Sequence, residues 1–154
     1  MLERVDWDNA NCIAELGAGT GVFTREIVKR AKPDAKILVF EIDPALQKMI
    51  RDEHPEHQGL TLHSDAQELY SYMKSNGIEK LDFIISSLPF TVLPPKMTVR
   101  ILDGVMKSLK PGGHFVAYQY SSIMKHVLKK KFSHIKTRFV AFNIPPAFVY
   151  DCWR

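Results

Sequence analysis

The sequence predicts an α/β fold in which a seven-stranded, mostly parallel sheet carries helices on both faces and ends in a C-terminal antiparallel β-hairpin. Two observations predict it. Apolar runs of strand length alternate with helical patterns five times along the chain, and this alternation is typical of parallel sheets. The last two apolar runs are joined by residues 143–146 alone, and a connection this short can make only an antiparallel pair.

The first of the five units contains the most distinctive stretch of the chain, residues 15–24, with the sequence ELGAGTGVFT. An apolar strand at residues 12–14 leads into it, and a helical pattern over residues 25–29 follows. Glycine permits positive φ and close backbone approach, so a strand, a glycine turn and a helix start in succession predict a small-molecule cradle. The dinucleotide fingerprint G-x-G-x-x-G would need glycine where the chain has Val22, which disfavours a nicotinamide cofactor.

The remaining predicted strands are near-continuous apolar runs, as expected for strands that helices cover on both faces. They lie at residues 36–43, 60–63, 81–86 and 114–120, and the strands of the hairpin lie at residues 135–142 and 147–153.

The predicted helices lie between these strands. Asp43 caps the second helix, which Pro44 begins. The third starts at residues 64–66 and stops at residues 76–77, and its inner face consists of Leu69, Tyr70 and Met73. The fourth stops at residues 110–113, and its core stripe consists of Ile101, Leu102, Val105, Met106 and Leu109. The fifth is an amphipathic helix that Ser121 or Ser122 caps and that runs to Phe132.

Size and composition indicate a single domain over residues 1–154. No run of about 20 apolar residues predicts a membrane span, and the N-terminus lacks the apolar core of a signal peptide. Cys12 and Cys152 fall within predicted strands, and buried, reduced thiols are typical of a cytoplasmic protein. The net charge of +4 is mildly basic and favours anionic partners.

Ligands of such sheets bind outside the carboxyl ends of the strands, so polar side chains there are candidates for a binding site. Glu41 ends the second strand, about 20 residues beyond the glycine turn, where an acid can accept hydrogen bonds from both hydroxyls of a ribose. The alternative is a solvated acid that caps a helix, a role that Asp43 fills better than Glu41.

Gly17, Gly19 and Gly21, with Glu15 two positions ahead, form a G-x-G-x-G pattern that resembles motif I of the class I S-adenosylmethionine-dependent methyltransferases. The resemblance covers essentially the whole chain and implies a Rossmann-like fold with S-adenosylmethionine as cofactor. It implies that Glu15 and Gly17 lie around the methionine part, and that Asp65 accepts from the adenine amino group besides capping a helix. The expected cofactor-binding residues are Glu15, Gly17, Ala18, Gly19, Thr20, Gly21, Glu41, Ile42, Asp65, Ala66 and Ser86.

The segment after the fourth strand bears on the methyl acceptor. Ser87-Leu88-Pro89-Phe90 resembles the proline-aromatic motif of the bacterial ribosomal RNA adenine dimethyltransferases, but Ser87 stands where their Asn belongs, which disfavours adenine. A closer resemblance is to bacterial phospholipid N-methyltransferases of the ribosomal-dimethylase-like type, and it implies methylation of the amine of phosphatidylethanolamine. It is carried by residues 15–24, 86–89, 93–95, 100–102, 109–113 and 143–146. The expected acceptor-site residues are Ser87, Leu88, Pro89, Phe90 and Tyr120, with Tyr118 nearby.

The predicted helix at residues 122–132 carries four lysines, Lys125, Lys129, Lys130 and Lys131. They can bind an anionic membrane surface or RNA phosphates, or they form a solvated outer face of the helix that binds neither. The apolar loop 88–95 either enters lipid headgroups or closes over the site.

We expect the protein to bind the small-molecule cofactor and to make peripheral contact with an anionic membrane surface. We expect no metal, and RNA is a disfavoured partner. An RNA adenine N6-methyltransferase and a non-catalytic S-adenosylmethionine-binding module are the alternatives. Members of the family usually carry helices before the first strand, so we expect further residues ahead of residue 1 in the full protein.

Overall fold

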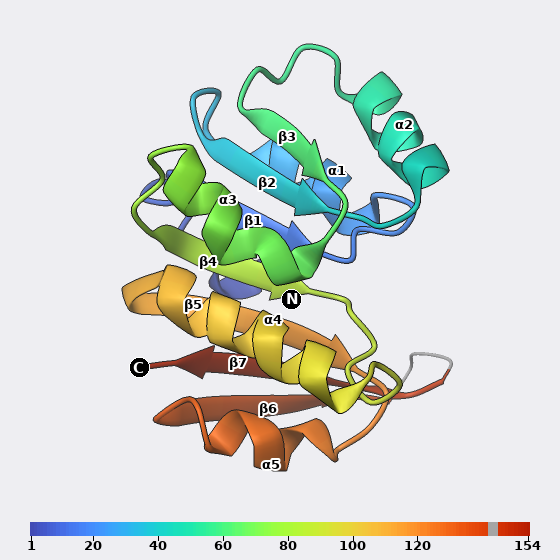
Figure 1. The fold of residues 1–154 in the computed structure, drawn as a ribbon, viewed down its shortest axis with the longest axis vertical. Coiled ribbons are helices and arrows are strands. Elements are labelled where there is room, and N and C mark those ends of the chain that lie inside the picture. Colours follow the sequence, from blue (N-terminus) through green and yellow to red (C-terminus); the bar gives the residue numbers. More distant parts are fainter. Residues whose placement is uncertain (142–144) are drawn as a thin grey trace.

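The computed structural model describes residues 1–141 and 145–154, which contain one seven-stranded sheet of order β3-β2-β1-β4-β5-β7-β6 (Figure 1). Only β7 runs against its neighbours; β1 to β5 pair in parallel. This confirms the predicted mostly parallel sheet with its antiparallel C-terminal hairpin. The strands are β1 (Cys12–Leu16), β2 (Lys36–Phe40), β3 (Leu60–His63), β4 (Leu81–Ser86), β5 (Leu109–Gln119), β6 (His134–Val140) and β7 (Ala147–Trp153).

Helices cover the sheet on both faces. One core contains Ile27 of α1 and Ile50 of α2 against one face, and the other contains side chains of α3, α4 and α5. Figure 1 shows α3, α4 and α5 in front of the sheet. The helices are α1 (Val22–Arg30), α2 (Pro44–Glu53), α3 (Leu69–Ser75), α4 (Pro95–Ser108) and α5 (Met124–Lys129), with short 3-10 turns η1 (Leu2–Arg4) and η2 (Ala66–Glu68).

The strand order places a switch point in the middle of the sheet. From β1 the chain moves outward through β2 to β3, and then crosses back to β4 on the other side of β1. The connections that leave the carboxyl ends of β1 and β4 therefore diverge, and a crevice opens between them, as in other open α/β sheets. Any ligand site of this fold is expected there.

The fifth strand begins earlier than the sequence predicts. Residues 110–113 were expected to end a helix, but α4 ends at Ser108 and β5 already begins at Leu109, which pairs with Leu81. The register shifts between this pair and the next, Phe83 with His114, so the Pro-Gly-Gly segment forms an irregularity within the strand. A pairing partner distant in the sequence overrides the local turn signal here.

Other boundaries differ by smaller amounts. The second strand ends at Phe40 and not at residue 43, and the fifth helix covers six residues and stops at Lys129, before Phe132. Tyr72, and not the predicted Tyr70, packs against the core. The predicted hairpin turn at residues 143–146 lies partly outside the described residues.

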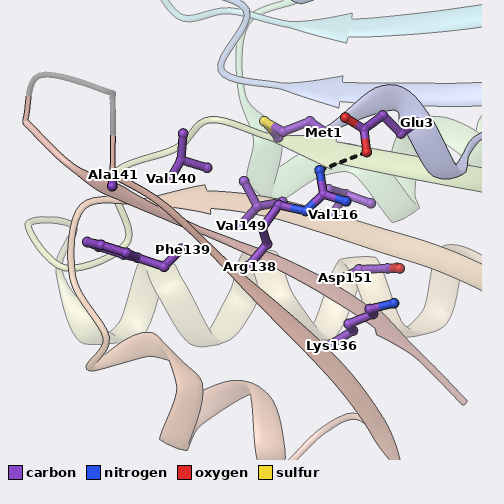
Figure 2. A pocket seen from close by; sticks show the side chains of 10 residues that line it. All are labelled: Met1, Glu3, Val116, Lys136, Arg138, Phe139, Val140, Ala141, Val149 and Asp151. Carbon is purple, nitrogen blue, oxygen red and sulfur yellow. Dashed lines mark hydrogen bonds and ion pairs between the residues drawn. The ribbon is translucent and has the colours of Figure 1, made fainter.

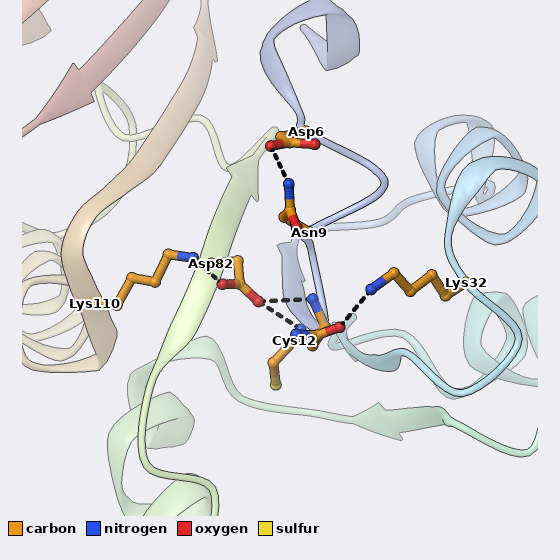
Figure 3. Close-up of polar contacts among 7 residues, drawn as sticks. Asp6, Asn9, Cys12, Lys32, Asp82 and Lys110 are labelled. Atoms are coloured by element: carbon orange, nitrogen blue, oxygen red, sulfur yellow. Dashed lines mark hydrogen bonds and ion pairs between the residues drawn. The ribbon is translucent and has the colours of Figure 1, made fainter.

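Asp82 connects three segments at the amino-terminal ends of the parallel strands (Figure 3). Its Oδ2 accepts the backbone N–H groups of Asn11 and Cys12, each at 2.8 Å, and its Oδ1 pairs with the Lys110 ammonium. Burial opposes ionisation of Asp82, but the hydrogen bonds from Lys110, Cys12 and Asn11 outweigh burial and hold the pKa of the carboxyl below its ordinary value. One side chain of β4 thereby ties the entry of β1 to the start of β5.

We expect Asp82→Ala to lower the free energy of unfolding by about 3 kcal/mol, because two backbone N–H groups lose their acceptor. The midpoint of thermal unfolding should fall by about 10 °C. Because the pKa of Asp82 is lowered, its stabilisation is present above the unfolded-state pKa and is lost as the pH falls through the folded-state value. Lys110→Met keeps both backbone hydrogen bonds and should cost about 1 kcal/mol or less; equal losses in the two variants would contradict this account.

Both cysteines lie inside the sheet and are buried free thiols. Burial raises the pKa of Cys12 to about 11 and that of Cys152 to about 12. Both thiols therefore stay protonated at neutral pH and act as small apolar side chains.

Candidate functional site

The glycine turn that follows β1 is built from three left-handed glycines. Gly17, Gly19 and Gly21 have φ values of 77°, 56° and 77°, which residues with a side chain rarely adopt. The N–H of Gly17 donates to the Phe40 carbonyl at 2.8 Å, which fastens the turn to the end of β2. Gly21 is the N-cap of α1. The structure thus forms the predicted succession of strand, glycine turn and helix.

Glu41 connects this turn to the second strand end. Its side chain is buried; Oε2 accepts the N–H of Gly19 at 2.7 Å, and Oε1 accepts the N–H of Asp43 at 3.0 Å. A carboxylate oxygen has two lone pairs, so each oxygen retains capacity for one more donor. Asp43 instead caps α2 by accepting the N–H of Ala45 at 2.8 Å. The two neighbouring acids therefore do different things, and only Glu41 lines the cavity described next.

A cavity of about 180 Å³ lies at the carboxyl ends of β1, β2 and β3 and beside the loop that follows β4. From the predicted site residues it brings together Gly17, Glu41, Ile42, Asp65, Ala66 and Leu88. It does not include Glu15, Ala18, Gly19, Thr20, Gly21, Ser86, Ser87, Pro89, Phe90 or Tyr120 in its lining. Six further lining residues were not predicted, namely Phe40, Ser64, Gln67, Leu93, Met97 and Ile101.

The sequence did contain a signal for three of the six lining residues that were not predicted. Leu93, Met97 and Ile101 are spaced by four residues, so they lie in one row along the start of α4 and the loop before it. From the sequence, Ile101 was assigned to the core and Leu93 to the apolar loop, and Met97 was given no role. In the structure all three residues line the cavity.

Asp65 and Ile42 shape the outer part of the cavity. The Asp65 carboxylate is exposed and accepts the Gln67 N–H at 2.8 Å as the N-cap of η2. Ile42 is 79% exposed although it lines the cavity, so it presents an apolar surface that a bound ring can cover. Gln47 of α2 donates to the Glu41 carbonyl at 2.6 Å and to Ser64 Oγ at 3.2 Å, and so ties two of the lining segments together.

Glu15 is a fully buried acid at the end of β1. Its Oε2 accepts the Thr24 hydroxyl at 2.6 Å, whereas its Oε1 has no hydrogen-bond partner within the described part of the chain. Burial raises the pKa of Glu15 to about 7; the hydrogen bond from Thr24 opposes the shift and the charge of Glu41 adds to it. An orphaned carboxylate oxygen beside the glycine turn fits a ligand that brings a cationic or N–H donor.

This raised pKa predicts a stability that depends on pH. The folded state holds the Glu15 proton up to about pH 7, whereas the unfolded state releases it near 4.5. The free energy of unfolding should therefore fall as the pH rises from about 4.5 through about 7 and change little above that. Denaturant titrations at about pH 5 and about pH 8 should show this loss in the wild type and not in Glu15→Gln. Glu79→Gln, at an exposed site, is the control, and a loss that persists in Glu15→Gln would refute the assignment.

The loop after β4 begins beside the glycine turn. The N–H of Ser87 donates to the Leu16 carbonyl at 3.0 Å, and the N–H of Leu88 donates to Ser86 Oγ at 3.3 Å. Phe90 is buried in the core, and Pro89 is exposed. The Ser87 hydroxyl is buried and lacks a hydrogen-bond partner in residues 1–141 and 145–154.

Tyr118 and Tyr120 lie at the carboxyl end of β5. Their rings meet edge to face with centroids 5.3 Å apart, and Tyr120 is 57% exposed. Burial and the neighbouring Tyr120 hydroxyl raise the pKa of Tyr118 to about 12. Tyr118 is therefore a phenol and not a phenolate at neutral pH.

A second cavity of about 490 Å³ lies on the face of β5, β7 and β6 beside the N-terminal segment (Figure 2). Figure 2 shows the ion pair between Arg138 and Glu3, at 2.7 Å, among its lining residues. The cavity is larger, but it contains neither the glycine turn nor Glu41 or Asp65. The convergence of backbone turn and acids identifies the smaller cavity as the candidate ligand site.

Across residues 1–141 and 145–154, no helix has the length and apolar character needed to cross a bilayer. The same residues contain no group of three His, Cys, Asp or Glu side chains placed to hold a metal ion.

Comparisons with known proteins match residues 13–113 to a family model described as a methyltransferase domain. The chain is 29% identical to the ornithine lipid N-methyltransferase of Singulisphaera acidiphila over 98% of its own length and 80% of that protein. It is 28% identical to the ribosomal RNA small subunit methyltransferase A of Clostridium acetobutylicum over 68% of its length, and spans 37% of that longer protein.

Solved structures show the same architecture at low sequence identity. The N-methyltransferase NodS of Bradyrhizobium japonicum, in complex with S-adenosyl-L-homocysteine, matches 93% of this chain and 77% of its own with a TM-score of 0.76 at 13% identity. The precorrin-6y C5,15-methyltransferase of Geobacter metallireducens matches 94% of this chain and 80% of its own with a TM-score of 0.71 at 17% identity. These likenesses concern the fold.

Proposed function

The chain belongs to the methyltransferase domain family, and we propose that it transfers methyl groups from S-adenosylmethionine to the amine of a membrane phospholipid. The observation that supports a lipid amine as the acceptor is the similarity to an ornithine lipid N-methyltransferase, which extends over 98% of the chain. Similarity to the ribosomal RNA enzyme covers 68% of it. Ser87, in place of the Asn typical of adenine methyltransferases, supports an aliphatic amine, of the phosphatidylethanolamine type, over adenine.

The cavity residues fit S-adenosylmethionine. In this proposal the glycine turn admits the cofactor close to the backbone, Glu41 accepts hydrogen bonds from the ribose hydroxyls, and Asp65 accepts one from the adenine amino group. Ile42 and Ala66 contact the adenine ring. Glu15 lies outside the cavity lining, at the start of the glycine turn, and its Oε1 is the acceptor proposed for the methionine part. The bound cofactor supplies an intrinsically reactive sulfonium methyl group, so the protein has mainly to orient the acceptor and exclude water.

The acceptor side is formed by the loop after β4 and by the end of β5. An alkylammonium is attracted to the ring faces of Tyr118 and Tyr120 and has to lose a proton before it can attack. The raised pKa of Tyr118 keeps its proton in place, so Tyr118 orients the amine and does not deprotonate it. The buried Ser87 hydroxyl is a free acceptor for an amine N–H.

The decisive experiment offers several acceptors to the protein with methyl-labelled S-adenosylmethionine. Vesicles with phosphatidylethanolamine, vesicles with ornithine lipid and ribosomal RNA are tested separately, and we expect label in a lipid amine. Label in RNA alone would favour an adenine N6-methyltransferase, and cofactor binding without any transfer would favour a non-catalytic binding module. Calorimetry should show binding of S-adenosylmethionine in the micromolar range, and its absence would overturn the proposal.

Peripheral contact with an anionic membrane surface forms part of the proposal. The carboxyl ends of β4, β5 and β6 and the starts of α4 and α5 lie on one side of the molecule (Figure 1). Large apolar side chains in or beside these segments are exposed. They are Val92, Tyr120, Ile123 and Phe139, with exposed fractions of 76%, 57%, 69% and 56%. Lys96 and Lys125 are exposed at the starts of α4 and α5. Apolar and cationic side chains together are what an anionic interface attracts.

We expect the double variant Val92→Asp/Ile123→Asp to bind anionic vesicles about tenfold more weakly, because two apolar contacts are lost and two negative charges are added. Vesicle flotation or tryptophan fluorescence measures this. Val99→Asp changes a half-exposed valine on α4, outside the set of residues named above, and should bind like the wild type. An equal loss in both proteins would show a general charge effect and no specific contact edge.

A further inference from the structure

Gln119 is a buried amide at the last position of β5. Its side chain is 2% exposed, and its Nε2 donates to the backbone carbonyl of Leu88 at 2.7 Å. A polar side chain at such a position costs free energy unless it is hydrogen-bonded. Phe115 and Ala117, on the same face of β5, are apolar and belong to the core. The amide therefore stands out on this apolar face, and its hydrogen bond reaches a residue 31 positions earlier in the sequence.

The partner of this hydrogen bond occupies a central place in the site. The Leu88 carbonyl also accepts the N–H of Phe90 at 2.9 Å, so both of its lone pairs are used. These two hydrogen bonds fix the orientation of the Leu88 peptide group. The Leu88 side chain lines the cofactor cavity and packs against Gly17 so closely that a Cβ on Gly17 would lie 2.8 Å from Leu88 Cδ2. Leu88 thus contacts the glycine turn through its side chain and β5 through its carbonyl.

We propose that Gln119 is a positioning residue for methyl transfer, which fixes the acceptor loop at residues 87–94 relative to the glycine turn by holding the Leu88 carbonyl. The inference rests on the proposed function, because it assigns the loop to the acceptor side. Gln119 pairs with Phe148 of β7 and is followed by the exposed Tyr120, which the proposed function places on the acceptor side. In-line transfer is sensitive to the separation of donor and nucleophile, and a displacement of about 1 Å can cost about a hundredfold in rate.

The test compares Gln119→Met with the wild type. Methionine has a similar size and shape but no N–H donor, so the hydrogen bond to the Leu88 carbonyl is removed with little change in volume. We expect kcat with the lipid acceptor to fall about tenfold to a hundredfold, whereas Kd for S-adenosylmethionine should change less than about threefold. Lys110→Met, at the opposite edge of the sheet, measures the effect of reduced stability alone and should keep its kcat.

Hydrogen exchange of the loop gives a readout that needs no acceptor. Amides of residues 88–93 should exchange faster in Gln119→Met, and those of the glycine turn should not. Unchanged exchange and a kcat within about threefold of the wild type would overturn the inference, as would equal losses of kcat and cofactor affinity. A wild type that binds no cofactor would instead refute the proposed function, and the exchange data would still decide whether Gln119 holds the loop.

Discussion

Replacing Glu41 with alanine is expected to weaken the binding of S-adenosylmethionine by about a hundredfold. Two hydrogen bonds from ribose hydroxyls to a carboxylate contribute about 1.5 kcal/mol each, and their loss of about 3 kcal/mol corresponds to about two powers of ten in Kd. The variant also removes the acceptor of the Gly19 N–H at 2.7 Å, which loosens the turn that approaches the cofactor. Isothermal titration calorimetry on the purified chain measures the change.

Two further variants make this result specific. Asp43→Asn alters the neighbouring exposed acid but keeps a good N-cap for α2, so its Kd should stay within about twofold of the wild type. Glu41→Gln keeps the size of the side chain but has only one acceptor atom for the two N–H groups of Gly19 and Asp43. It should fall between the wild type and Glu41→Ala. Equal affinities of Glu41→Ala and Asp43→Asn for S-adenosylmethionine would show that Glu41 does not bind the cofactor.

The polar part of the candidate site could be predicted because it depends on local patterns. The glycine spacing requires positive φ at Gly17, Gly19 and Gly21, and the carboxyl ends of parallel strands meet at one edge, which brings Glu41 and Asp65 to one cavity. The same reasoning applies to the fold, since alternating apolar runs and one short connection were enough to predict seven strands and the reversed β7.

The other parts depend on contacts between residues far apart in the chain. The early start of β5 follows from its pairing with Leu81 and from the contact between Lys110 and Asp82, which no local pattern contains. Two hydrogen bonds join a glutamine side chain to a backbone carbonyl, Gln47 to Glu41 and Gln119 to Leu88. Both acceptors lie in loops whose conformation is not encoded in the periodicity of the sequence, so these contacts could not be predicted. One omission was avoidable: strand alternation places Gln119, and not Tyr120, on the face of Phe115 that the loop after β4 covers.

Gly17 is the position where a single methyl group should have the largest effect on the protein. Its φ of 77° costs an L-residue about 1–2 kcal/mol, and a Cβ there would lie 2.8 Å from Cδ2 and 3.3 Å from the backbone N of Leu88. The new methyl group would therefore push the acceptor loop away from the glycine turn. We expect Gly17→Ala to bind S-adenosylmethionine at least about a hundredfold more weakly and to show no measurable methyl transfer.

Gly77→Ala separates the cost of the backbone from the steric clash. Gly77 also has a left-handed φ, of 65°, but a Cβ there meets no atom within 4 Å. It directly follows the C-cap of α3 and does not line the cavity. It should lose about 1–2 kcal/mol of stability with unchanged cofactor affinity. In Gly17→Ala/Leu88→Ala the clashing side-chain atoms are gone, so part of the affinity should return. If Gly17→Ala and Gly77→Ala lost the same stability and kept the same Kd, contact between the glycine turn and Leu88 would not govern cofactor binding.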